Sequence, residues 1–103
     1  MQVPVNTGAH IDGREALTAH VEHEVEAALG RFGDWITRVE VHLSDESAGK
    51  AGGHRKCLME ARLAGRQPAA ASHESPHLHE AIAGALKKLT RLLETAHGRL
   101  DAH

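Results

Sequence analysis

The amino-acid sequence predicts an α+β fold, a two-layer sandwich with the element order β-α-β-β-β-α. Residues 38–44 and 56–63 alternate apolar with polar side chains, which is the period of a strand buried on one face. Residues 12–29 and 76–100 repeat apolar side chains three and four positions apart, as amphipathic helices do. Two such helices bury their apolar stripes together on one face of a four-stranded sheet, so we expect the opposite face to be solvated.

Residues 2–6 form the first predicted strand, and Pro4 indicates a position at an edge of the sheet. The first helix is expected from Asp12, whose side chain can cap it, to about Leu29, with Gly30 as the C-terminal signal. The apolar stripe of this helix consists of Leu17, Val21, Val25, Ala28 and Phe32.

Turn and cap signals place the remaining elements. The polar, Gly-rich residues 45–53 predict a hairpin connection, and residues 64–67 predict a tight turn into a fourth strand over residues 68–73. The alanines of this strand have weak strand propensity, so its prediction depends on context. The dipeptide Ser75-Pro76 predicts the start of the second helix, which runs to about Leu100. Its apolar stripe consists of Leu78, Ile82, Ala85, Leu89, Leu93 and Ala96.

Composition limits the classes of function. A chain of 103 residues is long enough for one core, and its net charge of −2 excludes a strongly basic nucleic-acid binder while allowing a local basic face. Cys57 is the single cysteine, so no intrachain disulfide forms and the reducing cytoplasm is the expected location. No apolar run has the length that a bilayer span requires, so we expect no membrane partner.

The segments RFGDWITRVEVHLSDE (residues 31–46) and LHEAIAGALKKLTRLL (residues 78–93) carry a resemblance to a known family. The chain resembles, over nearly its whole length, the short form of the ribosome hibernation-promoting factor and ribosome-associated inhibitor (sigma-54 modulation) family. The resemblance implies the same β-α-β-β-β-α fold, similar to double-stranded-RNA-binding domains. It also implies steric binding to the rRNA of the small ribosomal subunit, which blocks translation in stressed or stationary cells.

Long members of this family carry a C-terminal domain that pairs ribosomes. Nothing in the sequence follows the second helix to supply such a module. We therefore expect residues 1–103 to form a single ribosome-associated domain without the ribosome-dimerisation domain.

The candidate RNA-binding surface is a row of basic residues that share one arc of the second helix: Lys87, Lys88, Arg91 and Arg99. Such a row can neutralise successive phosphates without reading bases. The resemblance matches Lys88 and Arg91 to basic positions of the family's second helix, and Lys87 and Arg99 less directly. An ordinary solvated face, with Glu80 and Glu94 nearby, explains the same pattern without RNA.

Further basic candidates are Arg38 and Arg62 on the solvated sheet face and Arg31 at the end of the first helix. Pairing with Glu40 and Glu60 across neighbouring strands explains the two sheet arginines equally well. Both interpretations stay open for these positions.

The first helix is acidic, with Glu15, Glu22 and Glu26 expected to face outward. Carboxylates that face phosphates are repulsive and lower both the on-rate and the affinity. The alternative interpretation is therefore a protein-interaction module, possibly homodimeric, that keeps the fold with weak RNA affinity.

Ten histidines are present, and His73, His77 and His79 gather near the start of the second helix. A closed zinc site needs four ligands in fixed geometry, so we treat these three as weak metal candidates and expect no metal or other cofactor. No nucleophile elbow or phosphate-binding Gly loop is present, and Cys57 occupies an inward strand position. The sequence thus predicts a protein that is not an enzyme.

Overall fold

The computed structural model describes residues 1–8, 11, 13–46 and 54–101 of the chain. Its elements follow in the order β1 (Val5–Thr7), α1 (Arg14–Leu29), the 3₁₀ helix η1 (Gly30–Trp35), β2 (Ile36–Asp45), β3 (Arg55–Leu63), β4 (Ala69–Ser75) and α2 (Leu78–Asp101). This order confirms the predicted α+β fold. The sequence pattern did not indicate η1, which the structure adds between α1 and β2.

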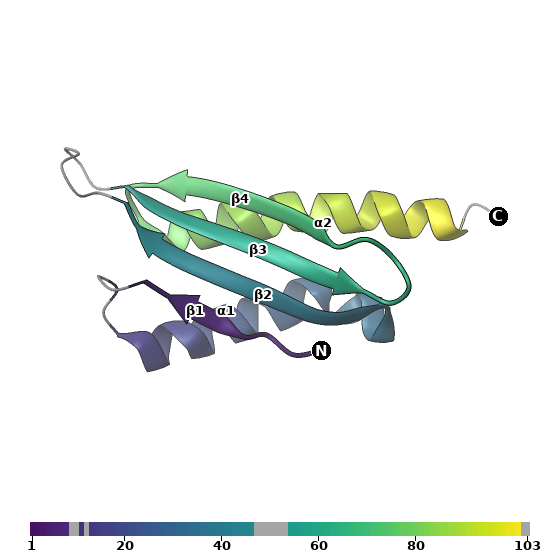
Figure 1. Ribbon diagram of the computed structural model, residues 1–103, viewed down its shortest axis with the longest axis horizontal. Helices are drawn as coiled ribbons and strands as arrows, with labels where there is room; N and C mark the ends of the chain where they lie inside the picture. Colours follow the sequence, from purple (N-terminus) through teal and green to yellow (C-terminus); the bar gives the residue numbers. More distant parts are fainter. Residues whose placement is uncertain (9–10, 12, 47–53, 102–103) are drawn as a thin grey trace.

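The four strands form one mixed sheet in the order β1-β2-β3-β4. β1 runs parallel to β2, whereas the pairs β2–β3 and β3–β4 are antiparallel. A parallel pair needs a crossover connection, and α1 provides it. Figure 1 shows both helices behind the sheet, on one face of it, while no described element covers the face toward the viewer. The predicted two-layer arrangement with one open sheet face is therefore confirmed.

The core lies between the sheet and the two helices. Its largest side chains expose at most 2 % of their surface: Val21, Val25, Leu29, Ile36, Val39, Val41, Leu43, Cys57, Met59, Ile82, Leu89 and Leu93. Burying one Leu or Val side chain in this way stabilises the folded state by about 1.5–3 kcal/mol. The period-2 pattern of β2 and β3 and the stripes of the helices therefore supply most of the stabilising free energy, because they meet in this layer.

The first strand starts later than its sequence pattern suggests. The carbonyls of Gln2 and Pro4 accept hydrogen bonds from the amides of Val39 and Val41, both at 2.9 Å, so pairing with β2 already begins at residue 2. Pro4 has no N–H to donate, so the ladder is interrupted there and the regular strand begins at Val5. β1 lies at the edge of the sheet, as Pro4 predicted.

Glycines set both ends of the α1–η1 segment. Gly13 precedes α1 with φ 69° and ψ 39° and makes no side-chain cap hydrogen bond, while the predicted cap Asp12 lies outside the described residues. Gly30 keeps a right-handed helical backbone and opens η1, so the chain does not leave the helical path there. Gly33, with φ 59° and ψ −138°, turns the chain into β2 in a conformation that side chains disfavour. Phe32 consequently belongs to η1, where it is buried.

The junction between β4 and α2 is built around Ser75. The Ser75 hydroxyl accepts a hydrogen bond from the His77 amide at 3.2 Å and donates one to Glu80 Oε2 at 2.7 Å. Ser75 therefore supplies the predicted cap contact, although it does so as the last residue of β4, and α2 begins at Leu78. β4 extends two residues beyond the predicted end at His73 because its pairing with β3 continues to Arg55.

α2 lies close to β4 at Gly84. A Cβ atom built on Gly84 would overlap the imidazole ring of His73, which projects from β4. The backbone at Gly84 does not have a positive φ, so the requirement for glycine is steric rather than conformational. This contact fixes the distance between the helix and the sheet edge.

Cys57 lies on the inward face of β3 and is fully buried, as its strand position predicted. Burial disfavours the thiolate and raises the pKa of the Cys57 thiol from 9.0 to about 12. The thiol is thus held neutral in the folded state.

Gly84→Ala is expected to destabilise the protein, although the same change at an open helical position stabilises by up to about 1 kcal/mol. The added methyl group would overlap the His73 ring and push α2 away from β4. Gly98→Ala is the matched control, since nothing lies within 4 Å of its added Cβ in the same helix. Urea denaturation measures both variants. A stabilised Gly84→Ala protein, or a cost that His73→Ala does not relieve, would contradict the contact.

The buried thiol predicts a loss of stability at alkaline pH. Unfolded thiols ionise above pH 9.0 while the folded one stays protonated to about pH 12, so the unfolded state binds fewer protons between these values. Stability contributed by this group is complete below the lower value and falls by about 1 kcal/mol per pH unit between the two. Cys57→Ala removes the titrating group, and equal alkaline slopes for the two proteins in urea denaturation would refute the prediction.

Candidate nucleic-acid interface

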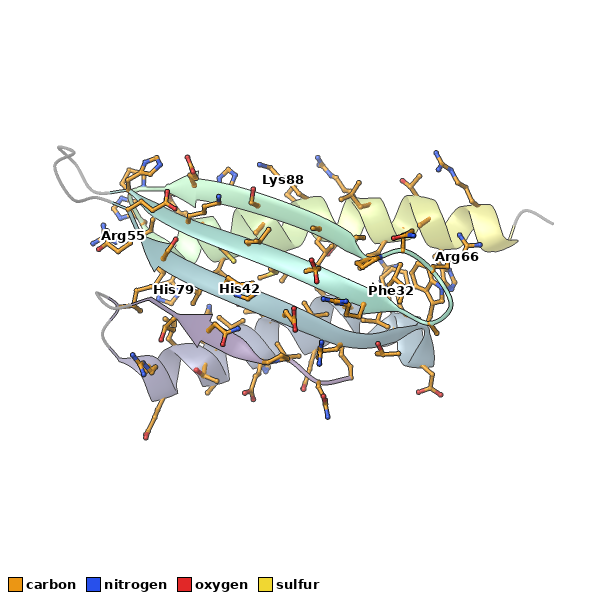
Figure 2. The ribbon with its side chains drawn as sticks, in the orientation of Figure 1. Phe32, His42, Arg55, Arg66, His79 and Lys88 are labelled. Atoms are coloured by element: carbon orange, nitrogen blue, oxygen red, sulfur yellow. The ribbon has the colours of Figure 1, made fainter. Side chains whose placement is uncertain are left out.

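The four basic residues predicted on α2 are all exposed but point in different directions. Lys88 lies at the β4 edge (Figure 2), where its Nζ donates a hydrogen bond to the Ser72 carbonyl at 3.0 Å. Lys87 and Arg91 instead line the groove between α1 and α2. Arg99 belongs to the last turn of α2. The predicted single row is therefore a broad basic face that extends from the inter-helix groove to the sheet edge.

The groove between the helices has a volume of about 520 Å³ and a largely apolar lining. α2 contributes Ile82, Ala83 and Leu86 to its lining, and α1 contributes Ala28. The polar lining comes from both helices and consists of His20, Glu24, His79, Lys87, Thr90, Arg91 and Glu94. Sequence reasoning missed this groove because the relative placement of two helices is not encoded in the stripe of either one.

Two carboxylates line the groove with Lys87 and Arg91, but each approaches a different basic group. Glu24 approaches His20 Nε2 at 3.8 Å, and Glu94 lies 3.3 Å from the guanidinium of Arg31. His20 also contacts His79 of α2, with ring centroids 4.7 Å apart and the rings nearly perpendicular. Glu94 is already paired with Arg31, so the two lining carboxylates do not neutralise Lys87 and Arg91 by direct ion pairs. Lys87 and Arg91 therefore belong to the basic face, which continues to Lys88 beside β4.

Glu24 lines the groove between the helices, but the other three glutamates of α1 lie on the flank that faces away from α2. Glu15 and Glu22 line a shallow surface hollow formed by α1 residues alone. Glu26 lines another hollow, next to the N-terminus and Asp34. None of these three residues lines the inter-helix groove, so they are separated from the basic face of α2 by the width of α1.

On the open sheet face, the two arginines pair with Glu40 and Glu60, but the predicted cross-strand pairing is limited to one contact, Arg62 with Glu40, while the two shorter pairs lie within a single strand. Arg62 lies 2.8 Å from Glu60 and 3.8 Å from Glu40, and Arg38 lies 3.0 Å from Glu40. Arg38 and Arg62 are directly opposite in the β2–β3 register, with Glu40 contacting both guanidinium groups. Exposed pairs of this kind are worth about 0–1 kcal/mol each, so they tether the arginines without immobilising them.

Arg31 is placed in η1 rather than at the end of α1. Its guanidinium lies 4.6 Å above the centre of the Phe32 ring. Phe32 and Trp35 both contact the His97 ring, at 5.4 and 5.0 Å between centroids, which joins η1 to the C-terminal half of α2. Figure 2 shows Phe32 and Arg66 at the same end of the sheet, opposite the end that holds Arg55.

The histidines predicted as weak metal candidates do not share one set of neighbours. His73 packs against α2 at Gly84, and His79 contacts His20 of α1. Within the described residues, His73, His77 and His79 do not form a group of ligand atoms close enough to share a metal ion. None of the described helices has both the length and the apolar character of a membrane span.

Solved structures of two known proteins share this fold. A ribosomal subunit interface protein from Coxiella burnetii is 17% identical, with a TM-score of 0.77 over 95% of this chain and 99% of that one. The N-terminal domain of Protein Y from Thermus thermophilus is 22% identical, with a TM-score of 0.74 over 92% of this chain and 98% of that one. No curated protein matches the chain significantly.

The sequence profile of the family described as "Sigma 54 modulation protein / S30EA ribosomal protein" matches residues 5–101. The match extends from β1 to the end of α2 and includes both segments that carry the resemblance. The chain therefore belongs to this family of ribosome-associated modulation proteins.

Proposed function

We propose that this protein binds the rRNA of the small ribosomal subunit and represses translation sterically in stressed or stationary cells. The observation that carries the proposal is the exposed basic face of α2, on a chain that belongs to a ribosome-associated family. The residues proposed to contact RNA there are Lys87, Lys88, Arg91 and Arg99. The mechanism is occupation of a site, which requires neither a catalytic group nor a cofactor, and it places the protein in the cytoplasm.

The proposed contacts are mainly electrostatic. Lysine and arginine side chains neutralise phosphates and position the protein, while base reading requires groups that reach base edges or stack on them. The chain has one Trp and one Phe, and Phe32 is buried, so stacking on the bases contributes little. Binding is therefore expected to weaken steeply as salt rises.

Arg38, Arg62 and Arg31 have a secondary role in the proposal. The two sheet arginines share Glu40, and Arg31 is paired with Glu94, so each must exchange a carboxylate for a phosphate when RNA binds. Because these pairs are exposed and weak, breaking them costs little free energy. The net contribution of each arginine to RNA binding is still smaller than that of a cation without an ion pair. Among the described side chains, Lys87, Arg91 and Arg99 make no ion pair that would have to be broken first.

The acidic flank of α1 favours a second candidate, a protein-interaction module that retains the fold and has weak RNA affinity. Glu15, Glu22 and Glu26 are exposed and present carboxylates that repel phosphates. They point away from the basic face of α2, so the flank is free to meet a basic protein surface. The two candidates differ in salt dependence, because a protein contact through this flank does not release the counterions of RNA.

Reversing charge at Lys88 and Arg91 tests the first candidate. The double variant Lys88→Glu and Arg91→Glu is expected to abolish co-migration with small ribosomal subunits in sucrose gradients, since two phosphate contacts become repulsive. The dependence of log affinity on log salt should flatten by about 0.7–0.9 for each lost contact.

The matched control is Arg14→Glu with Arg66→Glu, which changes the net charge equally at exposed positions outside the α2 face. The control should retain most of the co-migration, and thermal unfolding should show that both double variants are folded. Failure of the wild-type protein to co-migrate with small ribosomal subunits at low and moderate salt would refute the proposal. Equal loss in the two double variants would mean that only net charge matters.

Reversing the acidic flank separates the two candidates. Glu22→Lys with Glu26→Lys is expected to change small-subunit affinity by less than about tenfold, because screening limits the reach of these charges to about 10 Å at 0.1 M salt. A protein partner held by the flank would instead be lost in pull-down experiments. A larger gain in subunit binding would show that α1 itself faces the RNA.

A further inference from the structure

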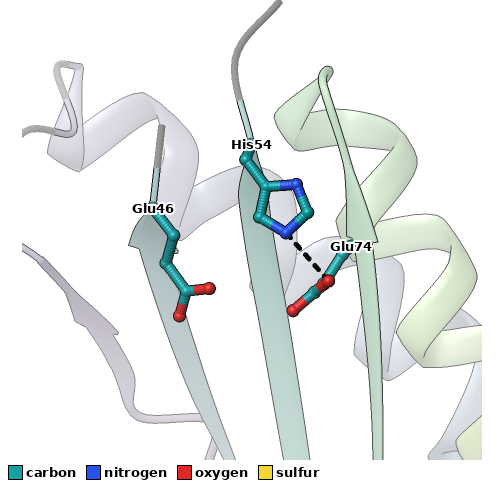
Figure 3. A group of neighbouring side chains, drawn as sticks. All are labelled: Glu46, His54 and Glu74. Atoms are coloured by element: carbon teal, nitrogen blue, oxygen red, sulfur yellow. Dashed lines mark hydrogen bonds and ion pairs between the residues drawn. The ribbon is translucent and has the colours of Figure 1, made fainter. Parts of the chain in front are cut away.

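Three potential metal ligands meet at one end of the open sheet face. Glu46, His54 and Glu74 each offer one ligand atom, and these atoms all lie within 4.8 Å of one another. Figure 3 shows the three side chains side by side, one from the end of each of three neighbouring strands. This group is separate from the α2 surface and from the histidines near the start of α2.

The strand register creates this group. The last pair of the β2–β3 ladder is Asp45 with Arg55. Glu46 directly follows this pair on one strand and His54 directly precedes it on the other, and the Glu46 amide donates a hydrogen bond to the His54 carbonyl at 2.6 Å. Glu74 pairs with Lys56 across β3 and β4, so it lies diagonally from His54 on the same face. Side chains alternate along each strand, so this register places all three on the open face of the sheet.

The strand ends beneath these side chains are held in place from the other face. Arg55 lies 3.6 Å from Asp45, its partner in the β2–β3 ladder, and donates to the Pro76 carbonyl at 2.7 Å. One side chain thus links β2, β3 and the start of the α2 segment. The backbone positions of Glu46, His54 and Glu74 are therefore coupled even though the two carboxylates are exposed and the imidazole is only partly buried.

The distances are close to those of a metal site. In a tetrahedral zinc site with metal–ligand bonds of about 2.0–2.1 Å, the ligand atoms are about 3.3 Å apart. His54 Nε2 and Glu74 Oε2 are 2.8 Å apart and would separate slightly, while Glu46 would move inward by a rotamer adjustment.

We propose that Glu46, His54 and Glu74 bind a divalent transition-metal ion of the zinc type, with water completing the coordination. One imidazole nitrogen and two carboxylate oxygens suit zinc and its neighbours better than magnesium or calcium, which prefer oxygen ligands alone. Two exposed carboxylates and one partly buried imidazole make an open site, so its affinity is below that of a closed four-ligand structural zinc site.

A bound ion would join three strands at the end of the β2–β3 hairpin next to its connection. Without it, the His54–Glu74 contact links only β3 and β4, and Glu46 is connected to β3 through the backbone. Lys56 lies on the same face opposite Glu74, and its charge lowers the local attraction for cations. The ion must therefore be held by direct ligation rather than by a negative field.

Zinc chloride titrated into the full chain in a non-coordinating buffer tests the site by calorimetry. The wild-type protein should bind one zinc ion per chain more tightly than any other. His54→Ala or Glu74→Gln should lower the affinity for this ion at least about tenfold. His42→Ala and Glu60→Gln are matched controls on the same face of β2 and β3, and they should stay within about twofold of wild type.

Amide NMR spectra locate the ion and check the fold of each variant. Zinc should shift the signals of Glu46, His54 and Glu74 before those of the other histidines, and magnesium chloride should leave them unchanged. The proposal is overturned if His54→Ala and Glu74→Gln bind zinc as wild type does, because the remaining histidines would then account for all binding. It is also overturned if zinc first shifts signals elsewhere. Ribosome co-migration without added zinc is measured separately, so failure of either proposal leaves the other testable.

Discussion

The packing of α2 against β3 and β4 is the contact on which the rest of the structure depends. Ile82, Leu89 and Leu93 are buried against the inward side chains of the sheet, which leaves the opposite side of the helix in water. That orientation exposes the basic residues of α2, since a helix that buries one stripe must present the other. The steric contact between Gly84 and His73 then sets how closely the basic face approaches the β4 edge.

Segregation of charge follows from this packing. The two helices share a groove lined by Lys87 and Arg91, while its carboxylates Glu24 and Glu94 approach His20 and Arg31. The carboxylates of Glu15, Glu22 and Glu26 lie beyond that groove, so the repulsion that they would impose on phosphates is directed away from α2. A chain with a net charge of −2 can in this way present a locally positive surface. Binding through such a surface is consistent with a role that depends on shape and charge rather than on base sequence.

The open sheet face has a different organisation from the helical face. Its arginines are tethered to Glu40 and Glu60 along the middle of β2 and β3. At the hairpin end the same alternation brings two carboxylates and one imidazole together, where a cation rather than an anion would be favoured. One face of the sheet thus combines a charge-paired centre with a separate ligand group, and neither requires the helices.

Hydrophobic periodicity determined the two helices, the strands and the open sheet face, because local burial patterns repeat with the geometry of each element. It also determined the inward position of Cys57 and the pairing of the sheet arginines with glutamates. The tertiary structure alone decided the direction of Lys88, the orientation of the acidic flank, and the meeting of Glu46, His54 and Glu74. Those features depend on strand register and on the placement of one helix beside another, which join residues far apart in the chain. No local pattern encodes such distances. A single glycine within a helix, such as Gly84, indicates close packing but does not identify the residue that packs against it.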